Sequence, residues 1–157
     1  MAVGVLEHHP YGTVRLHVPA ARGQPVELPA EVLAHAVDLS PQMIEHARAA
    51  GAGTDVAYAV ADVARLPFED ATFDLIVSSL SQHHWADVPG AVRDLRRVLR
   101  PGGRLWIYDV RWMLRGATRE VRAAFGADAV RRDVVRRFVA RLSATVPGPL
   151  STGSSSG

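Results

Sequence analysis

The stretch Val37-Asp38-Leu39-Ser40-Pro41 decides how this 157-residue chain is expected to fold. An apolar run ends at Asp38. Ser40 can cap the start of a helix with its side chain, and Pro41 is favoured at the first helical position. Apolar residues then recur at helical spacing as far as Gly51, at Met43, Ile44, Ala47 and Ala50. The sequence therefore predicts a strand that turns directly into a helix.

The same alternation of strand and helix continues along the chain. Val56, Tyr58 and Val60 stand at alternate positions, as in a short strand, and the apolar run 73–78 is typical of a strand buried on both faces. Asp87 begins another amphipathic helix, and the breaker Pro101-Gly102-Gly103 separates it from a strand at 104–109. With a further strand at 34–38, this order predicts an α/β fold, a parallel sheet flanked by helices.

The two ends of the chain are less regular. Residues 8–36 combine histidines with four prolines and show little periodicity. After Asp109 the chain is expected to be helical, because apolar residues recur every four positions at Val130, Val134, Phe138 and Leu142, with arginines between them. Residues 147–157 are rich in serine, glycine and proline, so we expect a single domain over 1–146 and a disordered tail.

The composition excludes several classes of protein. There is no cysteine, which excludes disulfides and thiolate metal sites and favours the cytoplasm. No apolar run is long enough to span a membrane, and residues 1–10 do not resemble a signal peptide. Every basic residue is arginine, as a GC-rich gene would produce, so the arginines predict no nucleic-acid partner. An arginine-rich helix near 131–141 keeps nucleic-acid binding open as a minor alternative.

Two aspartates follow predicted strands at their carboxyl ends, where ligands bind in open α/β sheets. Asp38 could accept hydrogen bonds from two adjacent ribose hydroxyls, or it could simply cap the following helix. Asp62 could accept a hydrogen bond from an adenine amino group, with the backbone N–H of Val63 donating to the ring. The alternative for Asp62 is an ordinary turn aspartate.

A third candidate group follows the strand at 73–78. The small residues Ser78 and Ser79 leave room for a ligand near the backbone, and His83, His84 and Trp85 come next. Paired histidines suggest a metal, but adjacent side chains diverge and no third ligand is near in the sequence, so we expect no metal site. Histidines that position a substrate and histidines that are only structural both remain open.

Four motifs occur in one order at near-fixed spacing: Val37–Met43, Asp62 with Leu66-Pro67-Phe68, Phe73–Val77 and Arg97–Gly103. This order resembles the class I S-adenosylmethionine-dependent methyltransferases, specifically the type 11 group, which includes the quinone-biosynthesis methyltransferases. The resemblance covers about residues 34–112. It implies a Rossmann-like sheet and transfer of a methyl group from S-adenosylmethionine to a small-molecule acceptor.

The resemblance also implies roles for single residues. Asp38 would hold the cofactor ribose, Leu39 and Met43 would contact the adenine, and Asp62 with Val63 would read its amino group. Ser78 and Ser79 would line the methionine part of the cofactor. His83 and His84 are the candidate catalytic residues, because an oxygen acceptor needs a base.

The chain departs from the family pattern near each end. Val5-Leu6-Glu7 is interpreted as the end of the first strand, and the glycine-rich loop expected next is replaced by residues 8–13, of which only Gly12 is glycine. Losing two or three hydrogen bonds of about 1 kcal/mol each predicts binding weakened roughly 10- to 100-fold. The family's last two strands are also expected to be missing, so the fold is predicted to be abbreviated at both ends.

Two explanations of residues 8–36 remain open, a shifted reading frame and genuine divergence of the enzyme. The impaired cofactor loop also keeps an alternative function open. In that reading the chain is a non-catalytic Rossmann-like remnant that acts through protein–protein contact.

Overall fold

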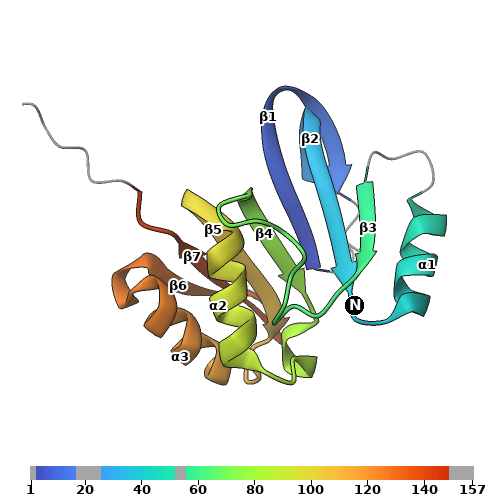
Figure 1. Cartoon of the computed structure of the whole chain (residues 1–157). Helices are drawn as coiled ribbons and strands as arrows, with labels where there is room; N and C mark the ends of the chain where they lie inside the picture. Colours follow the sequence, from blue (N-terminus) through green and yellow to red (C-terminus); the bar gives the residue numbers. More distant parts are fainter. Residues whose placement is uncertain (1–2, 17–25, 52–55, 149–157) are drawn as a thin grey trace, which may run out of the picture.

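The computed structural model describes residues 3–16, 26–51 and 56–148, with side chains described from Ala34 onward (Figure 1). In chain order the elements are β1 (Val3–Leu16), β2 (Val26–Asp38), α1 (Pro41–Ala50), β3 (Val56–Val60), β4 (Phe73–Ser79), the 3-10 turn η1 (Gln82–His84), α2 (Val88–Val98), β5 (Leu99–Val110), α3 (Leu114–Phe125), the 3-10 turn η2 (Ala127–Ala129), β6 (Val130–Arg136) and β7 (Val139–Thr145).

The described residues form a seven-stranded sheet in the order β3-β2-β1-β4-β5-β7-β6. β2 pairs in parallel with β3, and β4 pairs in parallel with β5. Helices α2 and α3 lie side by side against the β5–β7 half of the sheet, and α1 lies beside β3 at the other end (Figure 1). The α/β fold with parallel strands and flanking helices is therefore confirmed, including the four strands predicted between Ala34 and Asp109.

The central strand β1 runs against its neighbours. It is antiparallel to β2, with Val3 opposite Val37 and Leu16 opposite Val26, and antiparallel to β4. The interpretation of Val5–Glu7 as a strand end followed by a loop is wrong, because β1 continues through Leu16. Only nine residues separate β1 from β2, which is enough for a hairpin but short of the dozen or more that a parallel crossover needs.

The segment after α3 is a β-hairpin and not a helix. β6 and β7 pair antiparallel, and β7 pairs antiparallel with β5, so the prediction that the last two strands are missing is wrong. A spacing of four residues fits one face of a strand as well as one face of a helix, because four is an even number. The strand signal was the alternation in β7, where Ala140, Leu142 and Ala144 are buried.

The predicted helix starts are confirmed. The Ser40 side chain accepts a hydrogen bond from the backbone N–H of Met43, and Asp87 caps α2 by accepting from Gly90. The predicted apolar stripe enters the core, where Val92 and Leu95 of α2 and Leu99 at the start of β5 are almost completely buried. Their burial against β4 and β5 stabilises this half of the sheet by removing apolar area from water.

The link between β3 and β4 is held by Arg97 on α2. Its guanidinium donates to Asp94, to Asp70 and to the backbone carbonyls of Leu66 and Phe68. The hydrogen bonds to Asp94 and Asp70 raise the pKa of Arg97 above its ordinary value, although its burial acts in the opposite direction. The arginine of the Arg97–Gly103 motif therefore has a structural role, since it anchors the segment that leads away from Asp62.

The Pro-Gly-Gly sequence after α2 has two conformational requirements. Gly102 has a φ of +80°, a backbone conformation that residues with a Cβ atom rarely adopt. At Gly103 an added Cβ would lie 2.8 Å from the carbonyl oxygen of Arg100 and 3.0 Å from that of Phe73. Gly102 thus allows the turn, and Gly103 lets β5 approach the start of β4 closely.

Most of the predicted tail, residues 149–157, lies outside the described residues, and the single-domain boundary at 146 stays a prediction. Among the helices that the structure describes, none combines the length and the apolar character needed to cross a bilayer.

Candidate functional site

Strand direction brings four strand ends to one edge of the sheet. Because β1 is antiparallel to both β2 and β4, those two strands run the same way, and their parallel partners β3 and β5 follow them. The carboxyl ends of β2 to β5 therefore meet at one edge, where β1 contributes its beginning at Val3. This edge is where a doubly wound sheet binds its ligands.

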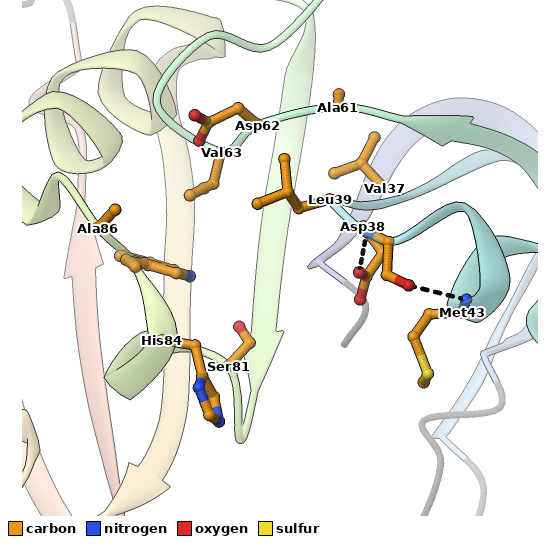
Figure 2. A pocket seen from close by; sticks show the side chains of 12 residues that line it. Val37, Asp38, Leu39, Met43, Ala61, Asp62, Val63, Ser81, His84 and Ala86 are labelled. Carbon is orange, nitrogen blue, oxygen red and sulfur yellow. Dashed lines mark hydrogen bonds between the residues drawn. The ribbon is translucent and has the colours of Figure 1, made fainter.

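A cleft of about 650 Å³ opens at this edge (Figure 2). Its volume lies within the range of small-molecule and cofactor sites. The lining residues come from the ends of β2 and β3, the start of α1 and the segment around η1: Val37, Asp38, Leu39, Ser40, Met43, Ala61, Asp62, Val63, Ser81, His84, Trp85 and Ala86. In Figure 2 the β2–α1 residues lie across the cleft from Ser81, His84 and Ala86.

Asp38 lies at the β2 side of the cleft with only 7% of its surface exposed. Its Oδ1 accepts a hydrogen bond of 2.8 Å from the backbone N–H of Ser40, which holds the carboxylate at the turn into α1. The capping alternative is therefore partly true, because Asp38 orders the turn while Ser40 caps the helix. Beside it, Leu39 is 71% exposed and Met43 is 45% exposed, so the cleft presents apolar side chains to solvent.

Asp62 lies at the β3 side of the same cleft. The backbone N–H of Ala61 donates to the carbonyl of Asp38 at 3.0 Å, which brings the ends of β2 and β3 together. The Oδ1 of Asp62 accepts from the backbone N–H of Ala64 at 2.9 Å, as in an ordinary turn, and the residue is exposed. Asp38 and Asp62 line one cleft, as the sequence predicted, together with Val63.

The serine expected to line the methionine part of a cofactor lies behind the cleft. Ser78 is completely buried, and its Oγ is 2.7 Å from the Oγ of Ser81. Ser81, and neither Ser78 nor Ser79, is among the cleft residues. β4 ends at Ser79, one residue beyond the predicted end, and the serine that lines the cleft lies three residues after Ser78.

The two candidate histidines differ in their surroundings. His84 lines the cleft, whereas His83 does not, and the two ring centroids are 4.1 Å apart. The Nδ1 atom of His83 lies 2.9 Å from both carboxylate oxygens of Asp109, which is completely buried at the end of β5. Asp109 was not identified from the sequence. The signal was available, because Asp109 is an acidic residue at the carboxyl end of a predicted strand, as Asp38 is.

The comparison with protein families agrees with this geometry. The family model described as a methyltransferase domain, of the type 11 group, matches residues 16–107. The chain belongs to the class I S-adenosylmethionine-dependent methyltransferases. S-adenosylmethionine is the methyl donor that gives this family its name.

Two curated relatives illustrate the likeness. The uncharacterized protein YafE of Escherichia coli is 40% identical over 80 residues, which cover 51% of this chain and 37% of the relative. The malonyl-[acyl-carrier protein] O-methyltransferase of Erwinia pyrifoliae is 39% identical over 90 residues, covering 57% and 32%. The chain thus matches about a third of the length of these relatives.

Solved structures share the fold at lower identity. The crystal structure of an S-adenosylmethionine-dependent methyltransferase from Aquifex aeolicus superimposes with a TM-score of 0.57 at 19% identity, covering 71% of this chain and 68% of that one. At this identity the likeness shows the fold alone.

Proposed function

We propose that this chain binds S-adenosylmethionine in the cleft and transfers its methyl group to a small-molecule acceptor. The observation that carries the proposal is the pairing of two carboxylates, Asp38 and Asp62, with the exposed apolar side chains of Leu39 and Met43 around one cleft. This combination suits an adenosine, which offers two ribose hydroxyls, an amino group and a flat apolar ring. A cytoplasmic location is part of the proposal, because the chain contains no cysteine.

In this proposal the cofactor contacts divide between the two sides of the cleft. Asp38 accepts hydrogen bonds from the ribose hydroxyls, and Asp62 and the backbone of Val63 bind the adenine edge. Leu39 and Met43 cover the ring faces. Ser81, held by the buried Ser78, faces the methionine part.

The fit is better for the adenosine half of the cofactor than for its amino-acid half. The carboxyl end of β1 at Leu16 lies opposite Val26, at the edge of the sheet away from the cleft. A glycine-rich loop introduced after Glu7 would interrupt β1, which runs from Val3 to Leu16. We therefore do not expect such a loop to improve cofactor binding. We therefore expect weak binding of S-adenosylmethionine, held mainly through its adenosine.

The bound cofactor supplies an electrophilic methyl group on a sulfonium. What this chain adds is in-line placement of the acceptor and, where the acceptor carries a proton, a group to receive it. His84 lines the cleft and the His83 ring lies 4.1 Å from the His84 ring, centroid to centroid, so these two are the candidate catalytic residues.

Calorimetric titration of the folded chain with S-adenosylmethionine tests this proposal. The Asp38→Asn variant keeps an oxygen that can accept from Ser40 but loses the charge, so its affinity should fall about tenfold to a hundredfold, the value of one or two charge-assisted hydrogen bonds. The effect should exceed that of His83→Ala. Asp128→Asn, at an exposed site on η2, is the matched control.

A folded chain that shows no binding in the calorimeter or by ligand-detected NMR would contradict the proposal and favour the non-catalytic remnant. Equal losses in the Asp38 and Asp128 variants would show that the cofactor binds elsewhere.

A further inference from the structure

The exposed large apolar side chains that the structure describes gather in two places. One group lies in the cleft or directly before its lining residues: Leu39, Met43 and Val60. The other lies where β5 ends and β6 turns into β7: Trp112, Met113, Val134, Val135 and Phe138. The proposed function uses the first group only. The second belongs to a surface made of residues 111–113 and 131–138, which we call the basic tip.

The two segments of the basic tip are joined to each other. The backbone N–H of Arg111 donates to the carbonyl of Phe138 at 2.9 Å, and the Arg132 guanidinium donates to the carbonyl of Arg111. The rings of Trp112 and Phe138 meet edge to face with their centroids 6.3 Å apart, yet each residue is 54% exposed. The two segments therefore form one surface.

The basic tip projects from the rest of the described chain. All eight residues 131–138 are exposed, and so are residues 111–113. Successive side chains of a strand point to opposite faces, so exposure of consecutive residues means that neither face of β6 is covered here by the described elements. β6 is also the outer strand of the sheet.

The charge of the chain is concentrated at the basic tip. It holds five arginines, at positions 111, 131, 132, 136 and 137, and one acidic residue, Asp133, which bonds to Arg141. Five arginines against one aspartate give it a formal charge of +4, whereas the whole chain carries +2, so the remaining residues are net negative. The Arg137 guanidinium lies 5.1 Å from the centroid of the Phe138 ring, so charge and apolar surface meet in adjacent side chains.

We propose that the basic tip docks this chain on the surface of an anionic lipid bilayer. Trp112, Met113 and Phe138 enter the interfacial region, and the arginines contact the lipid phosphates. Docking of this kind requires no segment that spans the membrane. Arg111 directly follows the carboxyl end of β5, so docking brings the edge of the sheet that carries the cleft to the bilayer. The proposal does not depend on what the cleft binds.

Two other anionic partners share part of this chemistry. A single-stranded nucleic acid would use the arginines and stack on the aromatic rings, but it would leave Met113, Val134 and Val135 in water. A folded acidic protein would have to offer a groove that fits the projecting tip. A fluid bilayer closes around an inserted tip and takes up both its charges and its apolar side chains. The bilayer therefore accounts for more of the surface than either alternative.

A purely structural role for the arginines is the remaining alternative. Charged side chains along an edge strand keep it from pairing with another sheet. This role accounts for Arg131, Arg132 and Arg136 on β6. It does not account for Trp112 and Phe138, which lie outside β6 and expose apolar surface to water.

The first test is co-sedimentation of the whole chain with vesicles made of equal parts of phosphatidylglycerol and phosphatidylcholine, compared with vesicles of phosphatidylcholine alone. We expect binding to the anionic vesicles only, weakened by added salt. Replacing both Arg131 and Arg137 with glutamine should lower the affinity about 25-fold, about fivefold for each arginine. Phe138→Ser should lower it about tenfold.

Matched controls remove the same kinds of side chain elsewhere. Arg122→Gln changes an exposed arginine in the last turn of α3, and Val60→Ser changes an exposed apolar residue at the end of β3. Neither should alter vesicle binding. Losses in the controls equal to those in the tip variants would overturn the proposal, because binding would then not involve the tip.

The second test uses Trp112 to detect entry into the bilayer. Its fluorescence emission should shift to shorter wavelengths on anionic vesicles and should be quenched by brominated phosphatidylcholine. Trp112→Phe keeps an aromatic ring, so it should change the affinity by no more than about twofold while most of the shift and quenching disappear. The remaining tryptophans are half-buried, Trp85 in the cleft and Trp106 within β5.

Several results would overturn the proposal. A chain that is folded by circular dichroism but does not bind the anionic vesicles, or binds both kinds equally, would do so. Vesicle binding without quenching of Trp112 would exclude entry of the tip. Oligothymidylate and poly-glutamate are the probes for the other partners. Tighter binding of either probe than of the vesicles, lost in the same tip variants, would overturn the bilayer in favour of nucleic acid or acidic protein.

Discussion

The β4–β5 pair and the β1–β2 pair lie next to each other in one sheet but are built differently. β4 and β5 are parallel, and the nineteen residues between them include η1 and α2. β1 and β2 are antiparallel, with only nine residues between them. A crossover helix permits parallel strands, whereas a short connection permits only a hairpin.

The difference between the two pairs has a consequence for the site. Reversing β1 leaves the directions of β2 to β5 unchanged, so the carboxyl ends that carry Asp38 and Asp109 still meet at one edge. It removes from that edge the strand end that a glycine-rich loop would follow. In the proposed function, the side of the cleft assigned to adenosine therefore keeps its strand ends, while the side assigned to the amino-acid end lacks the strand end that such a loop would follow.

The pairing of β1 with β2 can be tested by cross-linking, and this is the largest effect we expect. The chain has no cysteine, so paired cysteines introduced at Gly4 and Ala36, which lie opposite each other, should form a disulfide under mild oxidation. Cysteines at Gly4 and Val32 should not, because Val32 lies opposite His8. The yield is read from the mobility shift on a non-reducing gel, and cross-linking of only the second pair would contradict the described pairing of β1 with β2.

The parallel half should contain the larger share of the core stability. Phe73 at the start of β4 is completely buried and lies edge-to-face with Phe68 at 4.9 Å. Phe73→Ala should lower the free energy of unfolding by about 3–5 kcal/mol, measured by urea denaturation. The matched control is Phe138→Ala beside β7, where 54% of the residue is exposed and the loss should stay below about 1 kcal/mol. Equal losses would show that the core does not lie between α2, α3 and the β4–β5 pair.

The close approach of β5 to β4 should depend on Gly103. A Cβ at this position meets two backbone carbonyl oxygens, which cannot move away as a side chain could. Gly103→Ala should therefore destabilise by about 1–3 kcal/mol, the usual cost of overpacking. Gly116 in α3 has nothing within 4 Å of an added Cβ, so Gly116→Ala should stabilise the chain by about 0.5–1 kcal/mol. Thermal unfolding of both variants measures the contrast, and a stabilised Gly103→Ala variant would contradict the described geometry.

The sequence by itself determined the elements that have local signals. Ser40 and Asp87 predicted two helix starts because caps act within a few residues, and the apolar run at 73–78 predicted a buried strand. The placement of Asp38 and Asp62 around one cleft followed from their positions after parallel strands.

Only the tertiary structure decided features that depend on partners distant in the sequence. The direction of β1 depends on pairing with β2 and β4, and the β6–β7 hairpin depends on β5, because a four-residue spacing fits a strand as well as a helix. The pairing of His83 with Asp109 joins residues 26 positions apart. Local propensity and capping cannot specify such contacts, because packing of remote segments determines which strand or side chain satisfies each polar group.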